Sequence, residues 1–256
     1  MMKSVDVRDI KTLQGKRLEM GDTFRFKCHD RLDCFNLCCR NLNLYLYPYD
    51  VLRLKNNLKI SSDAFLDQYV DIVMKPSSFF PEVLLKMQEN DEKTCPFLSE
   101  KGCSVYPDRP DTCRTFPVEH GLLFGDSGEK PEIVHFFRPP VFCKGRHETD
   151  EMTVASWAED QNALIYNDMT ARWAAVKALF HQDPWGPEGF QGPKGKMTFM
   201  AAYNIDAFQE FVFKSSFLKR YNVKPALQKK IKKNQADLLK FAFSWIKLVV
   251  WGIKTG

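Results

Sequence analysis

The 256-residue sequence lacks the long apolar run of a membrane-spanning segment. Its longest apolar stretch, residues 241–253, falls short of the roughly 18 to 20 residues that a bilayer requires, and Lys247 interrupts it. The 13 Gly and 14 Pro follow no period, which excludes collagen-like and low-complexity chains. The 44% of apolar and 27% of charged residues are instead typical of a chain that folds around a hydrophobic core.

Several catalytic motifs are also missing. The sequence contains no G-x-G-x-x-G loop of dinucleotide-binding enzymes, no H-E-x-x-H zinc-protease motif and no G-x-S-x-G nucleophile motif. Gly195-Lys196 does not complete a phosphate-binding loop, because Phe190 occupies the position of its first glycine and Met197 replaces the required Ser or Thr. No motif therefore assigns the chain to one of these enzyme classes.

The first 20 residues contain eight charged side chains and no apolar segment of the kind found in signal peptides. We therefore expect a cytoplasmic protein. Because the cytoplasm keeps thiols reduced, clustered cysteines there are more often metal ligands or catalytic groups than disulfides.

Eight cysteines are present, and the 113 residues after the last of them contain none. Four thiols within twelve residues can converge on one centre without a long loop, and thiolates bind soft metal ions strongly. Two of the cysteines, Cys38 and Cys39, are adjacent, and neighbouring side chains usually diverge. One of the two can therefore bind at one site while the other begins a second site or only packs. The spacing is Cys28-x5-Cys34-x3-Cys38-Cys39, then Cys95-x7-Cys103-x9-Cys113, and finally Cys143.

Three other roles of these cysteines stay open. Disulfides would need an oxidising compartment, and buried free thiols are common singly but not in clusters. A nucleophilic or redox thiol would need a base, and His29 and His120 are nearby in sequence only. Metal binding accounts best for the clustering, but an all-sulfur site suits zinc and an iron–sulfur cluster equally.

The cysteine blocks together resemble the YkgJ-type cysteine-cluster family, which is described as a zinc- or iron-chelating domain. The resemblance extends from about Phe24 to Gly145, although five and three residues separate the first cysteines where two or three are usual. The blocks that carry it are residues 28–39, Cys95-Pro96-Phe97-Leu98, Gly102-Cys103-Ser104-Val105-Tyr106 and Arg109-Pro110-Asp111-Thr112-Cys113-Arg114-Thr115-Phe116-Pro117.

The resemblance implies a metal centre, whose cofactor would be an iron–sulfur cluster, with [4Fe–4S] as the favoured type, or zinc. We expect its ligands to be Cys38, Cys39, Cys95, Cys103, Cys113 and Cys143, with Cys28 and Cys34 next because their spacing departs from the family pattern.

Three residues beyond the cysteines are candidates for this site. His29 is the one histidine to test as a ligand, because it lies beside Cys28. Pro110 is expected to begin a short helix that carries Cys113 and Arg114. Arg109 and Arg114 would then donate hydrogen bonds to cluster sulfurs or to a carboxylate, unless they form ordinary surface ion pairs.

The hydrophobic pattern predicts an α+β fold. A loop-rich cysteine-cluster domain is expected at residues 20–147 and a helical segment of about three helices at 148–256. In the first domain, alternating apolar residues predict short strands at 42–47, 83–87, 122–124 and 132–137. Helices are expected at 49–55 and 62–73, the second with N-caps at 61–63.

Three helices are expected in the C-terminal part. Apolar residues at steps of three, four or seven predict a helix of about 30 residues that ends near residue 180. The Gly- and Pro-rich stretch 181–196 is expected to be a loop. Two more helices are predicted at 205–221, with Asn204 as N-cap, and from Pro225 to about residue 249.

Positive charge is concentrated at the C-terminal end. Residues 201–256 hold 11 Lys and Arg but only three acids, a net charge of +8, whereas the whole chain carries +5. The run Lys229-Lys230-Ile231-Lys232-Lys233 suits a solvated helix face, nucleic acid or an anionic membrane. We expect the solvated face, with no strong nucleic-acid binding and at most a weak membrane-surface contact through this basic C-terminal region.

The sequence thus predicts a cytoplasmic metal-binding protein. An iron–sulfur cluster would give it an electron-transfer or redox role with a redox partner protein. One alternative is a modifying, methyltransferase-like enzyme, because the flagellin lysine methylase resembles this family in its cysteine cluster. The other is an interaction module that zinc stabilises. The sequence identifies no catalytic residue.

Overall fold

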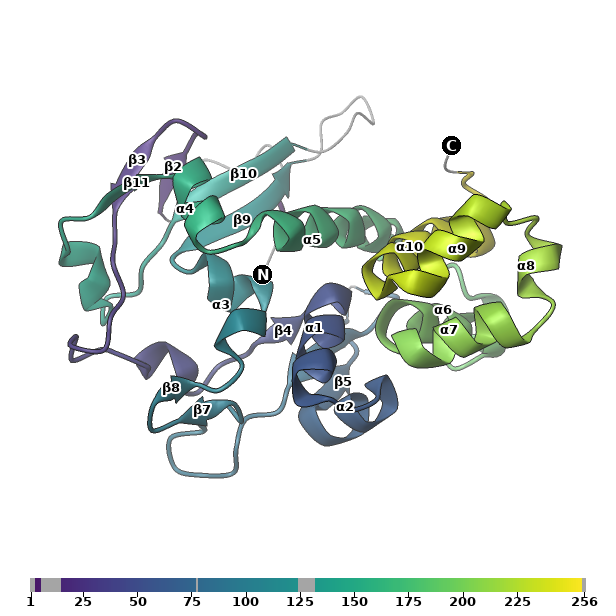
Figure 1. The fold of residues 1–256 in the computed structure, drawn as a ribbon, viewed down its shortest axis with the longest axis horizontal. Helices are drawn as coiled ribbons and strands as arrows, with labels where there is room; N and C mark the ends of the chain where they lie inside the picture. Colours follow the sequence, from purple (N-terminus) through teal and green to yellow (C-terminus); the bar gives the residue numbers. More distant parts are fainter. Residues whose placement is uncertain (1–2, 6–14, 77, 124–131, 255–256) are drawn as a thin grey trace. The chain divides into compact units, whose positions relative to one another are not determined.

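The computed structural model describes residues 3–5, 15–76, 78–123 and 132–254 (Figure 1). The predicted α+β class is confirmed, because short strands form small sheets and helices dominate the C-terminal half. The chain divides into two compact units. Unit 1 comprises the residues up to Leu44 together with Lys86–Ala174, and unit 2 comprises Tyr45–Leu85 and the residues from Ala175 onward.

These units follow packing rather than sequence order. Residues 45–85 pack with the C-terminal helices in unit 2, whereas all eight cysteines lie in unit 1. The sequence domains expected at 20–147 and 148–256 stay a prediction.

The largest sheet of unit 1 has four strands. Their order is β1 (Lys3–Val5), β9 (Val118–Leu123), β10 (Glu132–Phe137) and β2 (Lys16–Leu18). Strand β1 is parallel to β9, and the other neighbours are antiparallel. Two smaller antiparallel pairs are β3 (Thr23–Arg25) with β11 (Glu151–Thr153), and β7 (Leu98–Ser99) with β8 (Gly102–Cys103).

Short helices connect these strands. The 3-10 helices are η1 (Leu37–Cys39), η2 (Tyr106–Asp108) and η3 (Lys144–His147). The α-helices are α3 (Asp111–Thr115), α4 (Val154–Asp160) and α5 (Leu164–Lys177), and the last of these contains the boundary between the units.

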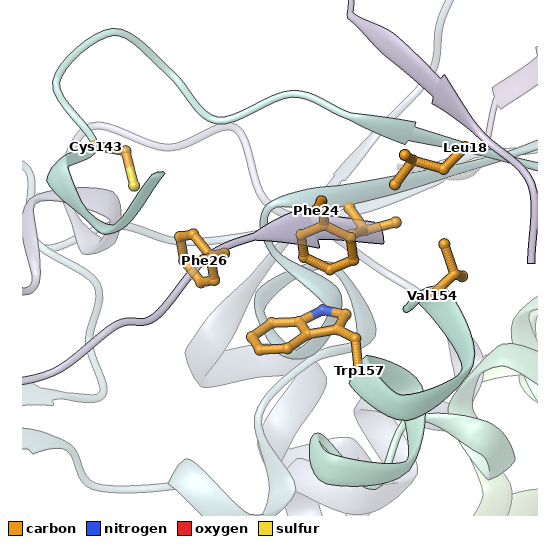
Figure 2. Close-up of a cluster of buried hydrophobic side chains, with 7 residues drawn as sticks. Leu18, Phe24, Phe26, Cys143, Val154 and Trp157 are labelled. Carbon is orange, nitrogen blue, oxygen red and sulfur yellow. The ribbon is translucent and has the colours of Figure 1, made fainter. Parts of the chain in front are cut away.

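Aromatic side chains form the core of unit 1 (Figure 2). The Trp157 ring meets Phe24 and Phe26 nearly at right angles, with ring centroids 6.0 and 5.4 Å apart. Such edge-to-face pairs stabilise beyond the area they bury, by about 0.5–1.5 kcal/mol each. The buried Cys143 belongs to the same cluster, together with Leu18, Val118 and Val154. The core thus reaches the segment that carries the last cysteine.

Unit 2 has one antiparallel sheet, in the order β4 (Tyr45–Leu46), β6 (Glu82–Leu85) and β5 (Val70–Val73). Its N-terminal helices are α1 (Pro48–Leu58) and α2 (Ser62–Tyr69). The C-terminal elements are η4 (Ala178–His181), η5 (Gly186–Glu188), α6 (Pro193–Tyr203), α7 (Ile205–Lys214), α8 (Phe217–Arg220), α9 (Pro225–Lys233) and α10 (Gln235–Trp251).

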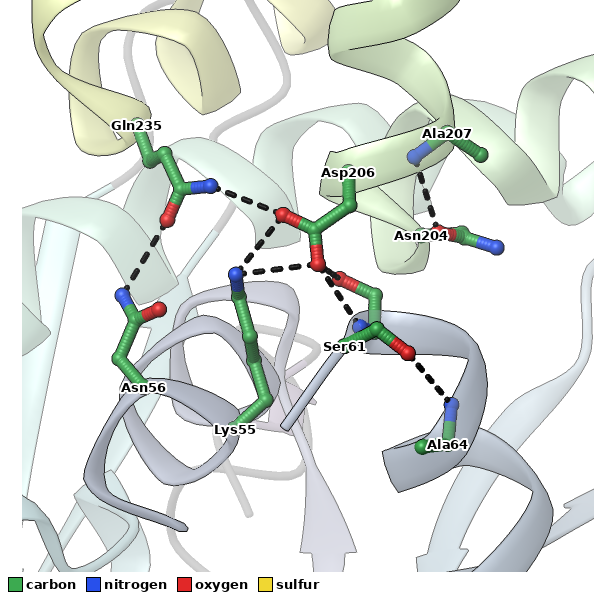
Figure 3. A network of polar contacts seen from close by, with 9 residues as sticks. Lys55, Asn56, Ser61, Ala64, Asn204, Asp206, Ala207 and Gln235 are labelled. Atoms are coloured by element: carbon green, nitrogen blue, oxygen red, sulfur yellow. Dashed lines mark hydrogen bonds and ion pairs between the residues drawn. The ribbon is translucent and has the colours of Figure 1, made fainter. Parts of the chain in front are cut away.

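An ion pair and the hydrogen bonds around it join four of these helices (Figure 3). Lys55 of α1, nearly inaccessible to solvent, donates to Asp206 of α7 at 2.8 Å. The same carboxylate accepts from the backbone N–H and the hydroxyl of Ser62 in α2, at 2.8 and 3.1 Å, and from the Gln235 amide in α10, at 2.9 Å. A buried charge is tolerated when it is paired and hydrogen-bonded in this way.

Several predicted elements are confirmed. Strand β10 matches the predicted range 132–137, and helix α1 covers 49–55. The predicted N-caps accept hydrogen bonds from the first turns of their helices: Ser61 from Ala64 and Asn204 from Ala207. Residue 124, the end of the strand expected at 122–124, lies outside the described residues, and β9 extends this strand back to Val118.

The long helices are divided more often than predicted. The helix predicted to end near residue 180 breaks where Asn162 adopts a left-handed φ of 51°. Ser215 interrupts the helix predicted at 205–221 and Asn234 the helix predicted from Pro225, each in an extended conformation. The helix expected at 62–73 was wrong over its last four residues, because Val70–Val73 pairs with β6 as β5. Helix α6 was not predicted, and its beginning at Pro193 shortens the expected loop 181–196.

Helix α10 forms part of the core of unit 2, since Leu238, Ala242, Trp245 and Ile246 are buried. Ile231 is the buried residue of α9, whose lysines are exposed. In the part of the chain that the structure describes, no helix combines the length and the apolar character needed to cross a membrane.

Candidate metal centre

The first four cysteines lie on a tightly wound segment. Successive turns are closed by hydrogen bonds from Phe35 N–H to the Leu32 carbonyl at 2.8 Å and from Cys39 N–H to the Asn36 carbonyl at 3.0 Å. Asn36 adopts φ 64°, a left-handed conformation that Asn tolerates better than most residues. This reversal begins η1, which places Cys38 and Cys39 in one short turn.

The second cysteine block is joined to the first through the backbone. Cys95 N–H donates a 2.8 Å hydrogen bond to the Cys39 carbonyl, and Arg40 forms a β-bridge with Thr94. The Thr94 hydroxyl bonds both Gln88 and Asn90 at 2.8 Å, which fixes the turn before Cys95. Cys39 and Cys95 therefore lie side by side although 55 residues separate them in the sequence.

A small hairpin holds Cys95 and Cys103. The Leu98 N–H closes a turn on the Cys95 carbonyl at 3.0 Å, and Leu98 then pairs with Cys103 across β7 and β8. Gly102 permits the connection because its φ of 106° is a conformation that side chains disfavour. The hairpin thus brings the two thiols to one end of the strand pair.

Cys143 is positioned near the first cysteine block by the pairing of residues 26–27 with residues 145–150. Phe26 N–H donates to the Asp150 carbonyl and Lys27 N–H to the Gly145 carbonyl, at 3.0 and 3.1 Å. Gly145 is required here, because a Cβ at this position would lie 2.6 Å from the Lys27 carbonyl oxygen. The contact sets Cys143 beside the first block, where Lys144 N–H lies 3.1 Å from the Cys34 sulfur.

Electrostatic interactions link these thiols to one another. Partial burial of the Cys28 sulfur, together with the smaller effects of Cys38, Cys143 and Cys34, raises the pKa of Cys28 to about 11. The pKa of Cys38 is raised by its hydrogen bond with Cys39 and by burial, and Cys38 in turn raises the pKa of Cys103. Seven of the eight cysteines are connected in this way, as neighbours that repel each other when deprotonated.

Backbone N–H groups oppose this effect at several sulfurs. The pKa of Cys95 is raised to about 11, because burial, which raises it, outweighs the N–H groups of Phe97 and Leu98, which lower it. Burial likewise raises the pKa of Cys103 and Cys143, and N–H groups two residues further along, at Val105 and Gly145, lower it. Turns of this kind direct donors at sulfur and favour the thiolate.

Cys113 lies on α3, the short helix that begins directly after Pro110, as predicted. The charge of Arg109 acts on both Cys113 and Cys103. Its guanidinium lies 3.8 Å from the centre of the Tyr106 ring and donates to the Gln161 side chain at 2.5 Å. A fixed positive charge thus faces two of the candidate ligands.

The expected contacts of the two arginines were wrong in detail. Arg109 and Arg114 are buried, so they do not form surface ion pairs. Arg114 donates to the carbonyl oxygens of Gln161 and Pro107, at 2.5 and 2.6 Å, and its guanidinium lies 4.1 Å from the Tyr166 ring centre. It anchors α3 to the segment before α5.

The eight cysteines are free thiols, so no disulfide joins them. No three His, Cys, Asp or Glu side chains within the described ranges are arranged to hold a single metal ion. The donor set nevertheless suits a soft metal, since connected thiols with raised pKa values are stabilised when a cation replaces their protons. The assignment of individual cysteines as ligands stays a prediction.

Sequence reasoning missed the residues that arrange the site. Lys144 contributes only its backbone N–H, and Gly145 only its lack of a side chain. Both depend on the pairing of residues 26–27 with 145–150, for which the sequence has no local pattern.

Comparison with known proteins supports the chemistry of this site. Residues 27–144 match the model of the CxxCxxCC family, described as "Putative zinc- or iron-chelating domain". This match confirms, over residues 27–144, the resemblance drawn from the sequence. Searches of curated proteins and of solved structures gave no match.

Proposed function

We propose that the cysteines of unit 1 hold an iron–sulfur cluster of the [4Fe–4S] type, with zinc as the alternative metal. The ligands would come from Cys38, Cys39, Cys95, Cys103, Cys113 and Cys143, with Cys28 and Cys34 beside them. The family match supports zinc or iron binding in general. The type of centre and its ligands are the further content of the proposal.

The backbone donors directed at sulfur carry this proposal. Lys144 N–H lies 3.1 Å from the Cys34 sulfur, and N–H groups act on Cys95, Cys103 and Cys143 as well. A buried thiol that only fills space needs no such donors. Donors to thiolate sulfur stabilise metal-bound cysteine and tune the potential of iron–sulfur clusters.

The surrounding residues place a positive charge near the candidate ligands and shield part of the site from solvent. Arg109 would offset part of the negative charge that thiolates bring to the centre. Cys143 is buried in the aromatic cluster, whereas Cys28 is exposed, so the site has one dry side and one side open to solvent. When bound, an iron–sulfur cluster supplies one-electron transfer, and zinc supplies a structural link between the cysteine segments.

An electron-transfer or redox role, with a redox partner protein and in the reducing cytoplasm, follows for the iron–sulfur form. Solvent access on the Cys28 side supports this role, because electron transfer requires close approach of a partner to the cluster. If the centre is zinc, its role is to stabilise unit 1.

Purification without oxygen tests the proposal. Iron and inorganic sulfide in equal amounts, with broad visible absorption that bleaches on reduction, are the expected result. Colourless protein with stoichiometric zinc would show that the centre is a structural zinc site and not an iron–sulfur cluster. Protein that holds neither metal, and that binds neither on anaerobic reconstitution, would contradict the proposal.

A further inference from the structure

His29 stands at the point where two segments of the candidate centre meet. It follows Cys28 directly, and the backbone just before it, at Phe26 and Lys27, pairs with the segment from Gly145 to Asp150. That partner segment carries Glu148 and begins two residues after Cys143. The two paired segments thus carry one imidazole and one carboxylate, and the thiols of Cys28 and Cys143 beside them interact electrostatically.

The two nitrogens of His29 have different surroundings. Nε2 lies 3.6 Å from the Glu148 carboxylate, at ion-pair distance. Nδ1 is buried and has no hydrogen-bond partner among the described residues, although the side chain as a whole is 22% exposed. A buried polar atom without a partner costs about 1–3 kcal/mol.

This arrangement is typical of a metal-binding histidine. Such a histidine usually directs one ring N–H at a carboxylate or carbonyl, which fixes the tautomer and leaves the other nitrogen free to coordinate. Here Glu148 faces Nε2, so the proton belongs on Nε2 and the lone pair on Nδ1. The sequence carries three other histidines in or near this unit's sheet and loops, but none of these has a carboxylate within ion-pair distance in the described ranges.

We propose that His29 Nδ1 is a ligand of the metal centre beside Cys28, with Glu148 as the carboxylate that orients it. This inference rests on the proposed metal centre and names one further ligand of it. It gives the centre at least one nitrogen donor instead of sulfur alone, a difference that changes both metal affinity and redox potential.

The first test needs no variant. The protein purified anaerobically with its own metal is examined by X-ray absorption at the edge of that metal. Imidazole scattering in addition to sulfur is expected. A shell of sulfur alone, in protein that holds its metal, would overturn the role of His29 and leave the proposed centre intact.

The second test uses matched variants and titration of the apoprotein with Zn²⁺ against a chelator. His29→Gln is expected to lower the affinity about 100-fold, and Glu148→Gln about 10-fold, by analogy with the losses known for groups around metal ligands. His181→Gln is the control, because His181 is exposed and lies in unit 2. Circular dichroism verifies that each variant is folded.

The outcomes separate the two proposals. Wild-type affinity in His29→Gln, with metal bound, would overturn the His29 assignment alone. Failure of the wild-type protein to bind Zn²⁺, or to hold iron when reconstituted, would overturn the metal centre and this inference with it. Weaker Zn²⁺ binding by His29→Gln with unchanged binding by His181→Gln, together with an X-ray absorption spectrum that shows imidazole in the wild type but sulfur alone in His29→Gln, would support both.

Discussion

The backbone N–H of Cys95 donates a 2.8 Å hydrogen bond to the carbonyl oxygen of Cys39. This bond joins the two cysteine blocks through the backbone and involves neither sulfur. The contact between the blocks therefore does not require a metal ion. The adjacent Arg40–Thr94 bridge continues the pairing. A metal would therefore bind to segments that the backbone already holds together, which lowers the entropy lost on binding.

Thr94→Val tests this backbone connection. Val keeps the shape of the side chain but removes the hydroxyl that bonds Gln88 and Asn90. Because the Thr94 side chain is buried and its partners would lose hydrogen bonds, we expect the free energy of unfolding to fall by about 1–2 kcal/mol. Chemical denaturation measures this loss, and an unchanged midpoint would show that the turn before Cys95 does not depend on the hydroxyl.

Gly145→Ala tests the contact that positions Cys143. The added Cβ would meet the Lys27 carbonyl oxygen at 2.6 Å and the Phe26 ring at 2.9 Å, so one of the two segments must move. We expect a loss of about 1–3 kcal/mol, the usual range for overpacking, together with weaker metal binding. Thermal unfolding and metal content are the measurements.

Gly21→Ala is the matched control, because a Cβ there has no neighbour within 4 Å. Its stability should stay within about 0.5 kcal/mol of the wild type. If Gly145→Ala behaves like this control in both measurements, the close approach of the two segments does not matter for the site.

How far the sequence predicts this structure depends on the range of the interaction. Ser61, Asn204 and Pro225 mark helix beginnings through their own chemistry, and these positions were predicted. Residues 70–73 become a strand only because β6 lies beside them, and no local pattern reveals that partner. Asn162 interrupts a continuous apolar stripe by one left-handed residue, which periodicity cannot detect.

The candidate site follows the same rule. The cysteines were chosen as candidate ligands from their spacing and the family resemblance, and His29 from its place beside Cys28, and both choices stay predictions. Glu148, Gly145 and the Lys144 N–H act through contacts with residues more than 100 positions away. The sequence therefore did not predict their roles in the site. Arg109 and Arg114 were expected near the centre, but their partners, Gln161 and Pro107, depend on the tertiary fold.

Asp206→Asn tests the buried network of unit 2. Although burial alone would raise the pKa of Asp206, its bonds with Lys55 and Ser62 hold that pKa below the ordinary value. Removal of the charge leaves Lys55 buried without an ionic partner, and we expect a loss of about 3 kcal/mol at neutral pH. Glu210→Gln, at an exposed ion pair, should change the stability by less than about 1 kcal/mol.

The loss in Asp206→Asn should depend on pH. The folded-state pKa is depressed, so the stabilisation by this carboxylate is complete above the unfolded pKa of about 3.9 and is lost as the pH falls through the folded value. Urea unfolding of wild type and variant at several pH values measures the difference. A difference that stays constant down to pH 2 would contradict the ionic role of Asp206.

Acid should also destabilise the large sheet of unit 1. His120 and His135 face each other across β9 and β10, with ring centroids 4.7 Å apart. Burial and the neighbouring His135 lower the pKa of His120 to about 3, and burial lowers the pKa of His135. Both rings are therefore neutral in the folded protein at neutral pH.

The sign of the pH effect follows from these depressed values. The unfolded histidines bind protons below about pH 6.5, so stability is full above that pH and falls as the pH drops toward 3, by up to about 1.4 kcal/mol per pH unit for each histidine. Imidazole NMR signals should show that His120 does not titrate near pH 6.5 in the folded protein. The double variant His120→Gln, His135→Gln should have a shallower acid limb, and an identical limb would refute the prediction.

The most direct test of the central claim compares metal content and unfolding temperature in four single variants, Cys38→Ser, Cys39→Ser, Cys95→Ser and Cys113→Ser, purified without oxygen. Because the binding free energy of a metal contributes to folding, each variant that removes a ligand should lose metal and melt at a lower temperature, in parallel. All four variants retaining the wild-type metal content and melting temperature would contradict a centre built from these cysteines.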